Sequence, residues 1–165
     1  MELSDLIIDV CMERCVEVAR KTLSNIKRPH VGVLVVSDSG KIVGEGYKKF
    51  VKGTSYVLHA ERMALDNAGE SAKGGYLFTT LEPCVKSRKH QVFSSCSELI
   101  LESGITKVII GLLDNSPSMK PGEGMTFLKK HGIEVMLHYN KRFAIKRELM
   151  PLGYGKSHNS YTGCY

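Results

Sequence analysis

The order in which apolar runs and amphipathic stretches follow one another limits this chain to one class of fold. Residues 31–36 (V-G-V-L-V-V) and 41–47 (K-I-V-G-E-G-Y) flank the turn S-D-S-G, a pattern that predicts a β-hairpin. Three further strands, predicted over 76–80, 107–112 and 133–138, alternate with predicted helices. Such alternation favours parallel strands in one sheet with helices on both faces. We therefore expect an α/β fold with three layers, α/β/α, around a five-stranded mixed sheet.

The helices and the domain boundary follow from the same pattern. Apolar residues near helical spacing predict helices over 4–26, 59–69, 96–104, 123–131 and 141–149. Cys11 and Cys15 are four residues apart on the first helix, and we expect both to pack in the core, since free cysteine behaves as a small hydrophobe. We assign residues 1–150 to one domain and 151–165 to a C-terminal tail that is flexible or caps a pocket.

Composition narrows the cellular setting and the class of ligand. The five cysteines are odd in number and scattered, as expected of reduced thiols or metal ligands in a cytoplasmic protein. The N-terminus lacks the pattern of a signal peptide, and no apolar run approaches the ~20 residues of a membrane span, so we expect no membrane association. The net charge of +6 fits either solubility or an anionic ligand, such as a phosphorylated metabolite or nucleic acid.

Three residues have the chemistry of a catalytic zinc site. Zinc favours imidazole nitrogen and thiolate sulfur, and a catalytic zinc keeps three protein ligands and one open position for water. His59, Cys84 and Cys96 would supply one nitrogen and two sulfurs to one Zn2+ per chain. His59 and Cys96 begin predicted helices, where the helix dipole stabilises a thiolate. A structural zinc would need a fourth ligand, for which His90 is the candidate.

Glu61 follows His59 by two residues and can face the same pocket without binding the metal. Zinc lowers the pKa of a bound water, and Glu61 can then accept that water's proton and deliver it to a ring nitrogen and a leaving amine. The pattern H-x-E followed by P-C is typical of zinc deaminases, although eleven residues separate Cys84 from Cys96.

Longer segments carry a resemblance to a known family. They are H-V-G-V-L-V-V-S-D-S-G-K-I-V-G-E-G-Y, H-A-E-R-M-A-L-D-N-A, Y-L-F-T-T-L-E-P-C, I-T-K-V-I-I-G-L-L-D-N-S-P and G-E-G-M-T-F-L-K-K-H-G-I-E-V. From about residue 4 to about 138 the chain resembles the cytidine deaminase-like superfamily, and most closely the deaminase domain of bacterial bifunctional riboflavin-biosynthesis enzymes. The resemblance implies a zinc-dependent aminohydrolase with ligands His59, Cys84 and Cys96, Glu61 as proton shuttle, and a homo-oligomer, most simply a dimer. Its implied substrate is a phosphorylated, ribosylated diaminopyrimidinone.

The chain departs from that family in its predicted pocket loops. Arg28 stands where the family has an asparagine, and Lys48 stands near the place of a family histidine. The family's D-P-N-P loop is D-N-S-P here, in which Asp114 and Asn115 are candidate substrate-binding residues. The loop between the two cysteines is longer than the family's. These departures leave the chemistry intact and bear on the substrate.

Three functions are compatible with the sequence. The first is deamination of a phosphorylated pyrimidine-type metabolite, whose phosphate would be held by Lys86, Arg88, Lys89 and Arg28. The second is deamination of a nucleoside, another heterocycle or a base in RNA or DNA, for which basic loops carry the aromatic residues Tyr47, Phe50, Tyr56 and Phe93. The third is a non-catalytic binding module with a deaminase-like fold, against which the intact Glu61 argues.

Overall fold

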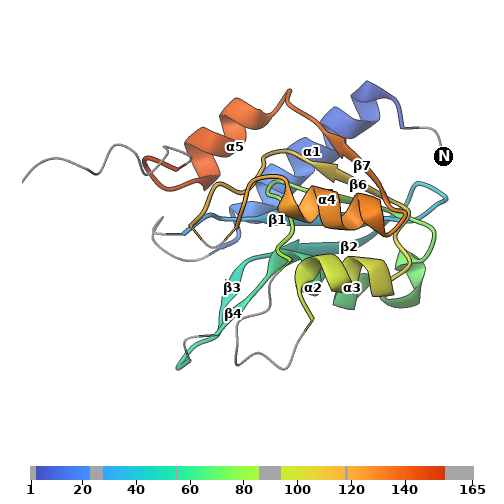
Figure 1. The fold of residues 1–165 in the computed structure, drawn as a ribbon, viewed down its shortest axis with the longest axis horizontal. Coiled ribbons are helices and arrows are strands. Elements are labelled where there is room, and N and C mark those ends of the chain that lie inside the picture. The colour runs from blue at the N-terminus through green and yellow to red at the C-terminus, as the bar shows by residue number, and fades with distance from the viewer. Residues whose placement is uncertain (1–2, 23–27, 55, 86–93, 118, 155–165) are drawn as a thin grey trace, which may run out of the picture.

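The computed structural model describes residues 3–22, 28–54, 56–85, 94–117 and 119–154 (Figure 1). The elements are α1 (Asp5–Ala19), β1 (Gly32–Val36), β2 (Ile42–Tyr47), β3 (Lys49–Phe50), β4 (Val57–Leu58), α2 (Ala60–Ala68), the 3₁₀ helix η1 (Gly69–Ala72), β5 (Tyr76–Thr79), α3 (Cys96–Glu102), β6 (Lys107–Ile110), α4 (Glu123–Lys130), β7 (Glu134–Leu137) and α5 (Arg142–Leu149). In the described parts of the chain, no helix has both the length and the apolar character that crossing a membrane requires.

The central sheet is mixed, as predicted. Its strands lie in the order β2-β1-β5-β6-β7. β1 is antiparallel to both β2 and β5, whereas β5, β6 and β7 are parallel to one another. The hairpin therefore contributes the antiparallel edge, and the alternating strands and helices contribute the parallel half. The predicted order of elements and the five-stranded mixed sheet are confirmed.

Helices cover both faces of this sheet, as the register of two glycines shows. A Cβ atom at Gly32 would collide with the backbone carbonyl of Cys15 on α1. A Cβ atom at Gly46 would collide with the carbonyl of Ala60 on α2. Gly46 pairs with Val33, the neighbour of Gly32, so the two glycines lie on opposite faces of the sheet. Figure 1 accordingly shows α1 and α5 on one side of the sheet and α2 and α3 on the other.

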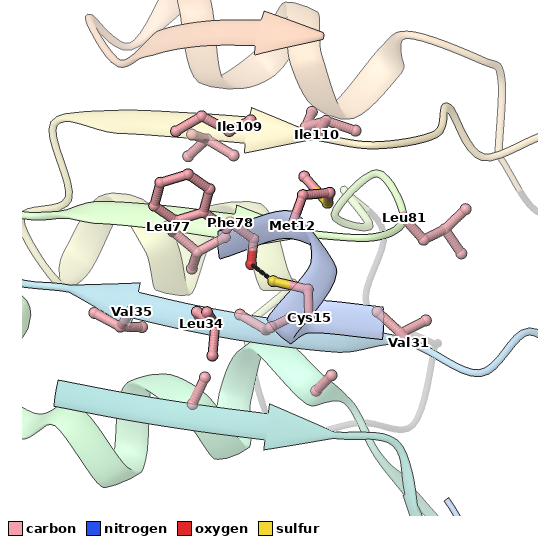
Figure 2. Close-up of a cluster of buried hydrophobic side chains, with 14 of the residues drawn as sticks. Met12, Cys15, Val31, Leu34, Val35, Leu77, Phe78, Leu81, Ile109 and Ile110 are labelled. Atoms are coloured by element: carbon pink, nitrogen blue, oxygen red, sulfur yellow. Dashed lines mark hydrogen bonds between the residues drawn. The ribbon is translucent and has the colours of Figure 1, made fainter. Parts of the chain in front are cut away.

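The core between α1 and the sheet contains the first cysteine pair. Figure 2 shows Cys15 beside Met12 and Phe78, all three of which are fully buried. The Cys15 thiol donates a hydrogen bond to the carbonyl of Phe78 at 3.5 Å. Cys11 is half-buried and packs against the edge of the same cluster. The expectation that this pair packs in the core is confirmed.

The first helix is shorter than its pattern predicted. It ends at Ala19, and the amides of Lys21 and Thr22 donate to the carbonyls three residues earlier. These tight turns replace the i to i−4 bonds of an α-helix. The predicted extension to residue 26 is wrong for 20–22, and residues 23–27 lie outside the described ones.

Residues 49–50 and 57–58 form a small two-stranded ribbon. Lys49 pairs with Leu58 and Phe50 with Val57. Strands of two residues are too short to show alternation, which is why the sequence pattern did not predict them. The ribbon leads directly into α2 and so helps to place the residues at the start of that helix.

Candidate active site

Three different elements bring the predicted metal ligands together. His59 is the N-cap of α2, Cys84 follows β5, and Cys96 is the first residue of α3. Nδ1 of His59 lies 3.3 Å from Sγ of Cys96 and 3.8 Å from Sγ of Cys84. The three ligand atoms all lie within 4.8 Å of one another. The ligand atoms of His59 and Cys96, which are 37 positions apart in sequence, thus lie side by side.

The start of α3 fixes the position of Cys96. The Ser95 side chain accepts a hydrogen bond from the Glu98 amide at 3.2 Å, and the Glu98 carboxylate accepts one from the Ser95 amide at 2.7 Å. This capping box begins the helix at Cys96. The first amides of α3 then turn toward Cys84: the Cys96 amide donates to its sulfur at 3.4 Å and the Ser97 amide to its carbonyl at 3.0 Å.

The ligand cluster shifts the pKa of each member. Hydrogen bonds from Cys96 and His59 lower the pKa of Cys84 to about 4, so that this thiol is ionised at neutral pH. The hydrogen bond between Cys96 and Cys84, together with the burial of Cys96, raises the pKa of the Cys96 thiol well above its usual value. The hydrogen bond to Cys84 also raises the pKa of His59. The cluster thus holds one thiolate, and a metal ion would displace the protons of Cys96 and His59 as it binds.

Glu61 lies in the first turn of α2 beside the cluster. Its side chain is only 4% exposed, and burial raises its pKa. It borders a cavity of about 50 Å³, which has room for more than one water molecule. The cavity is lined by Val31, Lys48, His59, Ala60, Glu61, Leu81, Glu82 and Cys84.

A second buried carboxylate organises the loops around this cavity. Glu82 is 3% exposed and accepts hydrogen bonds from the amides of Asp114, Gly122 and Met125, each at 3.0 Å. Two of these amides belong to the start of α4 and the third to the loop after β6. A Cβ atom at Gly124 would collide with the carbonyl of Pro83, so α4 lies directly against the turn that carries Cys84.

Lys48 contributes a basic amino group to the wall of the cavity. Its Nζ donates a hydrogen bond to the carbonyl of Pro29 at 2.7 Å. Burial lowers its pKa, while the carboxylates of Glu61 and Asp114 oppose that shift. Arg28 acts on Lys48 electrostatically and its side chain is exposed, which places it outside the cavity near Lys48.

The candidate substrate-binding residues are placed unequally. Asp114 is half-buried and held to Glu82 through its amide, so it lies at the edge of the site. The Asn115 side chain is exposed, and its amide donates to the hydroxyl of Tyr154 at 3.1 Å. The remaining candidates, Lys86, Arg88 and Lys89, lie outside the described residues. So do the alternative zinc ligand His90 and the aromatic residue Phe93.

Comparison with known proteins identifies the family. The family model described as the cytidine and deoxycytidylate deaminase zinc-binding region matches residues 7–112. This range contains the whole ligand cluster and Glu61. The chain belongs to this deaminase family.

Proteins with similar sequences support the same family assignment for this deaminase. It is 41% identical over 124 residues to the diaminohydroxyphosphoribosylamino-pyrimidine deaminase of Buchnera aphidicola subsp. Schizaphis graminum, covering 70% of the chain and 78% of that protein. It is 44% identical over 107 residues to the riboflavin biosynthesis protein RibD of Aquifex aeolicus, covering 65% of the chain and 28% of RibD.

A solved structure confirms the cytidine deaminase-like fold. The diaminohydroxyphosphoribosylaminopyrimidine deaminase/5-amino-6-(5-phosphoribosylamino)uracil reductase of Thermotoga maritima superposes with a TM-score of 0.74 at 36% identity, covering 88% of this chain and 40% of that one. The deaminase described here thus spans less than half of the Aquifex and Thermotoga proteins.

The donor atoms of this deaminase fit its family's zinc ion. Bond lengths of about 2.0 Å to nitrogen and 2.3 Å to sulfur place the ligands of tetrahedral zinc roughly 3.5–3.8 Å apart. The sulfur-to-nitrogen distances of 3.3 and 3.8 Å are close to these values. One imidazole and two thiolates leave a fourth position for water, as catalytic zinc requires.

Three residues around the site were not assigned a role from the sequence. The sequence did offer a signal for Lys48, because it stands near the position of a histidine in the related family. The pattern did not place its side chain in the cavity. Glu82 adjoins the P-C turn, and nothing in its spacing indicated three amide partners. Tyr154 was predicted to belong to the tail, and the structure places its hydroxyl 2.6 Å from Asp114.

Proposed function

We propose that the chain hydrolytically removes an amino group from an amino-pyrimidine, and that its substrate is a phosphorylated ribosylaminopyrimidine of riboflavin-type biosynthesis. The similarity to the Buchnera deaminase supports this most strongly, because it spans most of both chains. In this proposal His59, Cys84 and Cys96 hold the zinc ion and Glu61 is the catalytic acid and base. Arg28, with Lys86, Arg88 and Lys89, would hold the phosphate, and Asp114 and Asn115 would contact the substrate.

The reaction replaces a carbon–nitrogen bond by a carbon–oxygen bond. Zinc, when bound, acidifies the attacking water. Glu61 accepts one proton of that water while the water oxygen adds to the amine-bearing ring carbon. Glu61 then passes this proton to the adjacent ring nitrogen. Next, Glu61 takes the second proton of the water from the new hydroxyl group and gives it to the amine, which leaves as ammonia as the ring carbon becomes a carbonyl. The raised pKa of Glu61 suits both directions of transfer, because a carboxyl with a higher pKa is a stronger base and remains partly protonated nearer neutrality.

The test of the chemistry is Glu61→Gln. The amide keeps the size of the side chain and cannot take up a proton, so we expect kcat to fall by at least about 10²-fold. Zinc content should stay near one ion per chain, because Glu61 is not a ligand. Glu70→Gln, on the exposed surface of η1, is the control and should retain full activity. Undiminished ammonia release by Glu61→Gln would contradict the mechanism.

The test of the substrate is a panel measured by ammonia release. It comprises the phosphorylated ribosylated diaminopyrimidinone, its dephosphorylated form, cytidine, dCMP, and short single-stranded DNA and RNA. We expect the phosphorylated diaminopyrimidinone to have the highest kcat/KM. Preference for an oligonucleotide, with salt-dependent binding, would instead favour a nucleic-acid deaminase. Absence of turnover on every compound by the zinc-loaded protein would favour the non-catalytic module.

We further infer that the protein works in the cytoplasm as a homodimer. The cysteines of the described residues are free thiols, which supports the location. Light scattering coupled to gel filtration should give twice the chain mass of 18.3 kDa. A monomer that retains full activity would contradict the dimer.

A further inference from the structure

Tyr154 joins the C-terminal segment to the rim of the active site. Its hydroxyl donates a hydrogen bond to Oδ1 of Asp114 at 2.6 Å and accepts one from the amide of Asn115 at 3.1 Å. The same Asp114 oxygen accepts the amide of Ser116 at 2.7 Å. One phenol thus fixes both a side chain and a main-chain group of the loop after β6.

The segment that carries Tyr154 is anchored on the protein. Ile145 of α5 is fully buried, and its side chain occupies the space that a Cβ atom at Gly111 would need. The carbonyl of Leu149 accepts the amide of His30 at 2.8 Å. Met150 is 4% exposed, and the Tyr154 amide closes a turn to the Pro151 carbonyl at 3.0 Å. The hydroxyl therefore approaches Asp114 from a fixed position.

The loop that Tyr154 holds is connected to the cavity on its other side. The Asp114 amide donates to the carboxylate of Glu82, which lines the cavity. Asp114 also lies near enough to Lys48, another cavity residue, to oppose the effect of burial on its pKa. Asp114 is therefore held on the cavity side through its amide, by Glu82, and on the outer side through its carboxylate, by Tyr154.

We propose that Tyr154 is a positioning residue of the deaminase, which holds Asp114 in the orientation that the substrate requires. The catalytic unit then extends past α5 to Tyr154, beyond the match to the family, which ends at residue 112. The family resemblance at this loop is D-P-N-P, whereas this chain has D-N-S-P without the first proline. A hydroxyl that binds both Asp114 and Asn115 restrains a loop that has lost that rigid residue. The part concerning the substrate rests on the proposed function.

The first measurement needs no substrate. In the full-length, zinc-loaded protein, Tyr154→Phe removes only the hydroxyl and leaves the ring. We expect the Asn115 amide to exchange its hydrogen about tenfold faster, with zinc content unchanged. Tyr139→Phe makes the same change at an exposed tyrosine and should leave this exchange unaltered. Unchanged exchange in Tyr154→Phe would overturn the proposal.

The second measurement is a double-mutant cycle on kcat/KM. Tyr154→Phe should lower kcat/KM about tenfold, mostly through KM, because it removes a hydrogen bond to a charged group. In the Asp114→Ala background the same change should alter kcat/KM less than about twofold. Equal losses in both backgrounds would show that Tyr154 acts independently of Asp114 and would overturn the proposal. If the wild-type protein prefers cytidine or dCMP, the proposed substrate is wrong, and the cycle measured on the preferred compound still tests Tyr154.

Discussion

The carboxylate of Glu82 accepts a hydrogen bond from the amide of Met125 at 3.0 Å, which ties the turn that carries Cys84 to the first turn of α4. Two more amides, of Gly122 and Asp114, bind its other oxygen. A carboxylate offers enough lone pairs for all three donors, whereas an amide side chain offers one oxygen. The charge of Glu82 therefore has a structural use next to the site.

Glu82→Gln should therefore destabilise the protein. The amide group would turn its own donors toward a backbone amide, leaving at least one buried donor without an acceptor. We expect a loss of about 2–4 kcal/mol in the free energy of unfolding, measured with urea on the zinc-loaded protein. Glu102→Gln, on the exposed end of α3, is the control and should change stability by less than about 0.5 kcal/mol. Equal stabilities of the two variants would argue against this role.

Lys48→Met should weaken substrate binding. The ammonium group lines the cavity beside Glu61, and a charge-assisted hydrogen bond there to a carbonyl or phosphate oxygen is lost with it. We expect KM to rise about tenfold while kcat changes less, measured by steady-state ammonia release. Lys49→Met removes a neighbouring cation on β3 whose side chain is exposed, and it should leave KM unchanged. A KM equal to that of the wild type would exclude Lys48 from binding.

The residues that sequence analysis found are those whose chemistry admits few alternatives. A histidine and two cysteines at the start of helices and after a strand have few uses besides a metal, and zinc chemistry fixes what must stand beside them. The five strands of the central sheet were equally predictable, because apolar runs and turns are local signals. Predicting the candidate ligand cluster, in which Nδ1 of His59 lies 3.3 and 3.8 Å from the two sulfurs, needed no knowledge of the loop between the cysteines.

The residues that sequence analysis missed act through contacts between distant segments. Glu82 binds amides 32–43 residues away, and Tyr154 binds a carboxylate 40 residues away. Lys48 reaches Pro29, 19 residues earlier. A carboxylate, a phenol or an ammonium group has many partners available to it in a folded chain. Its partner is decided by packing and has no fixed sequence spacing.

The pairing of Asp9 with His138 should make stability depend on pH at the acid end. Nε2 of His138 lies 2.6 Å from Oδ1 of Asp9 and lowers the pKa of that carboxyl, with help from Asn140. A lowered pKa in the folded state means that the pairing contributes fully above the usual carboxyl pKa near 4. Its contribution falls as the pH drops from there toward the lower folded-state value.

Asp9→Asn tests this dependence. The variant should be less stable than the wild type at pH 7, and the difference should shrink steadily below about pH 4, measured by urea unfolding at each pH. Asp66→Asn changes an exposed carboxyl on α2 and should give a small difference that stays constant with pH. A constant difference for Asp9→Asn would contradict the assignment.

The contact between Gly46 and Ala60 links the edge of the sheet to the candidate metal ligand His59. A methyl group at Gly46 would collide with the Ala60 carbonyl, so Gly46→Ala should push the first turn of α2 away from β2. Overpacking of this kind costs about 1–3 kcal/mol in the free energy of unfolding. Because His59 is the N-cap of α2, the same shift should move Nδ1 relative to the two sulfurs and weaken zinc binding. Zinc affinity, measured by competition with a chelator, should therefore fall together with stability. Lys41→Ala, exposed just before β2, should change neither quantity, and full zinc affinity in a destabilised Gly46→Ala would show that the contact supports the fold without positioning the ligand.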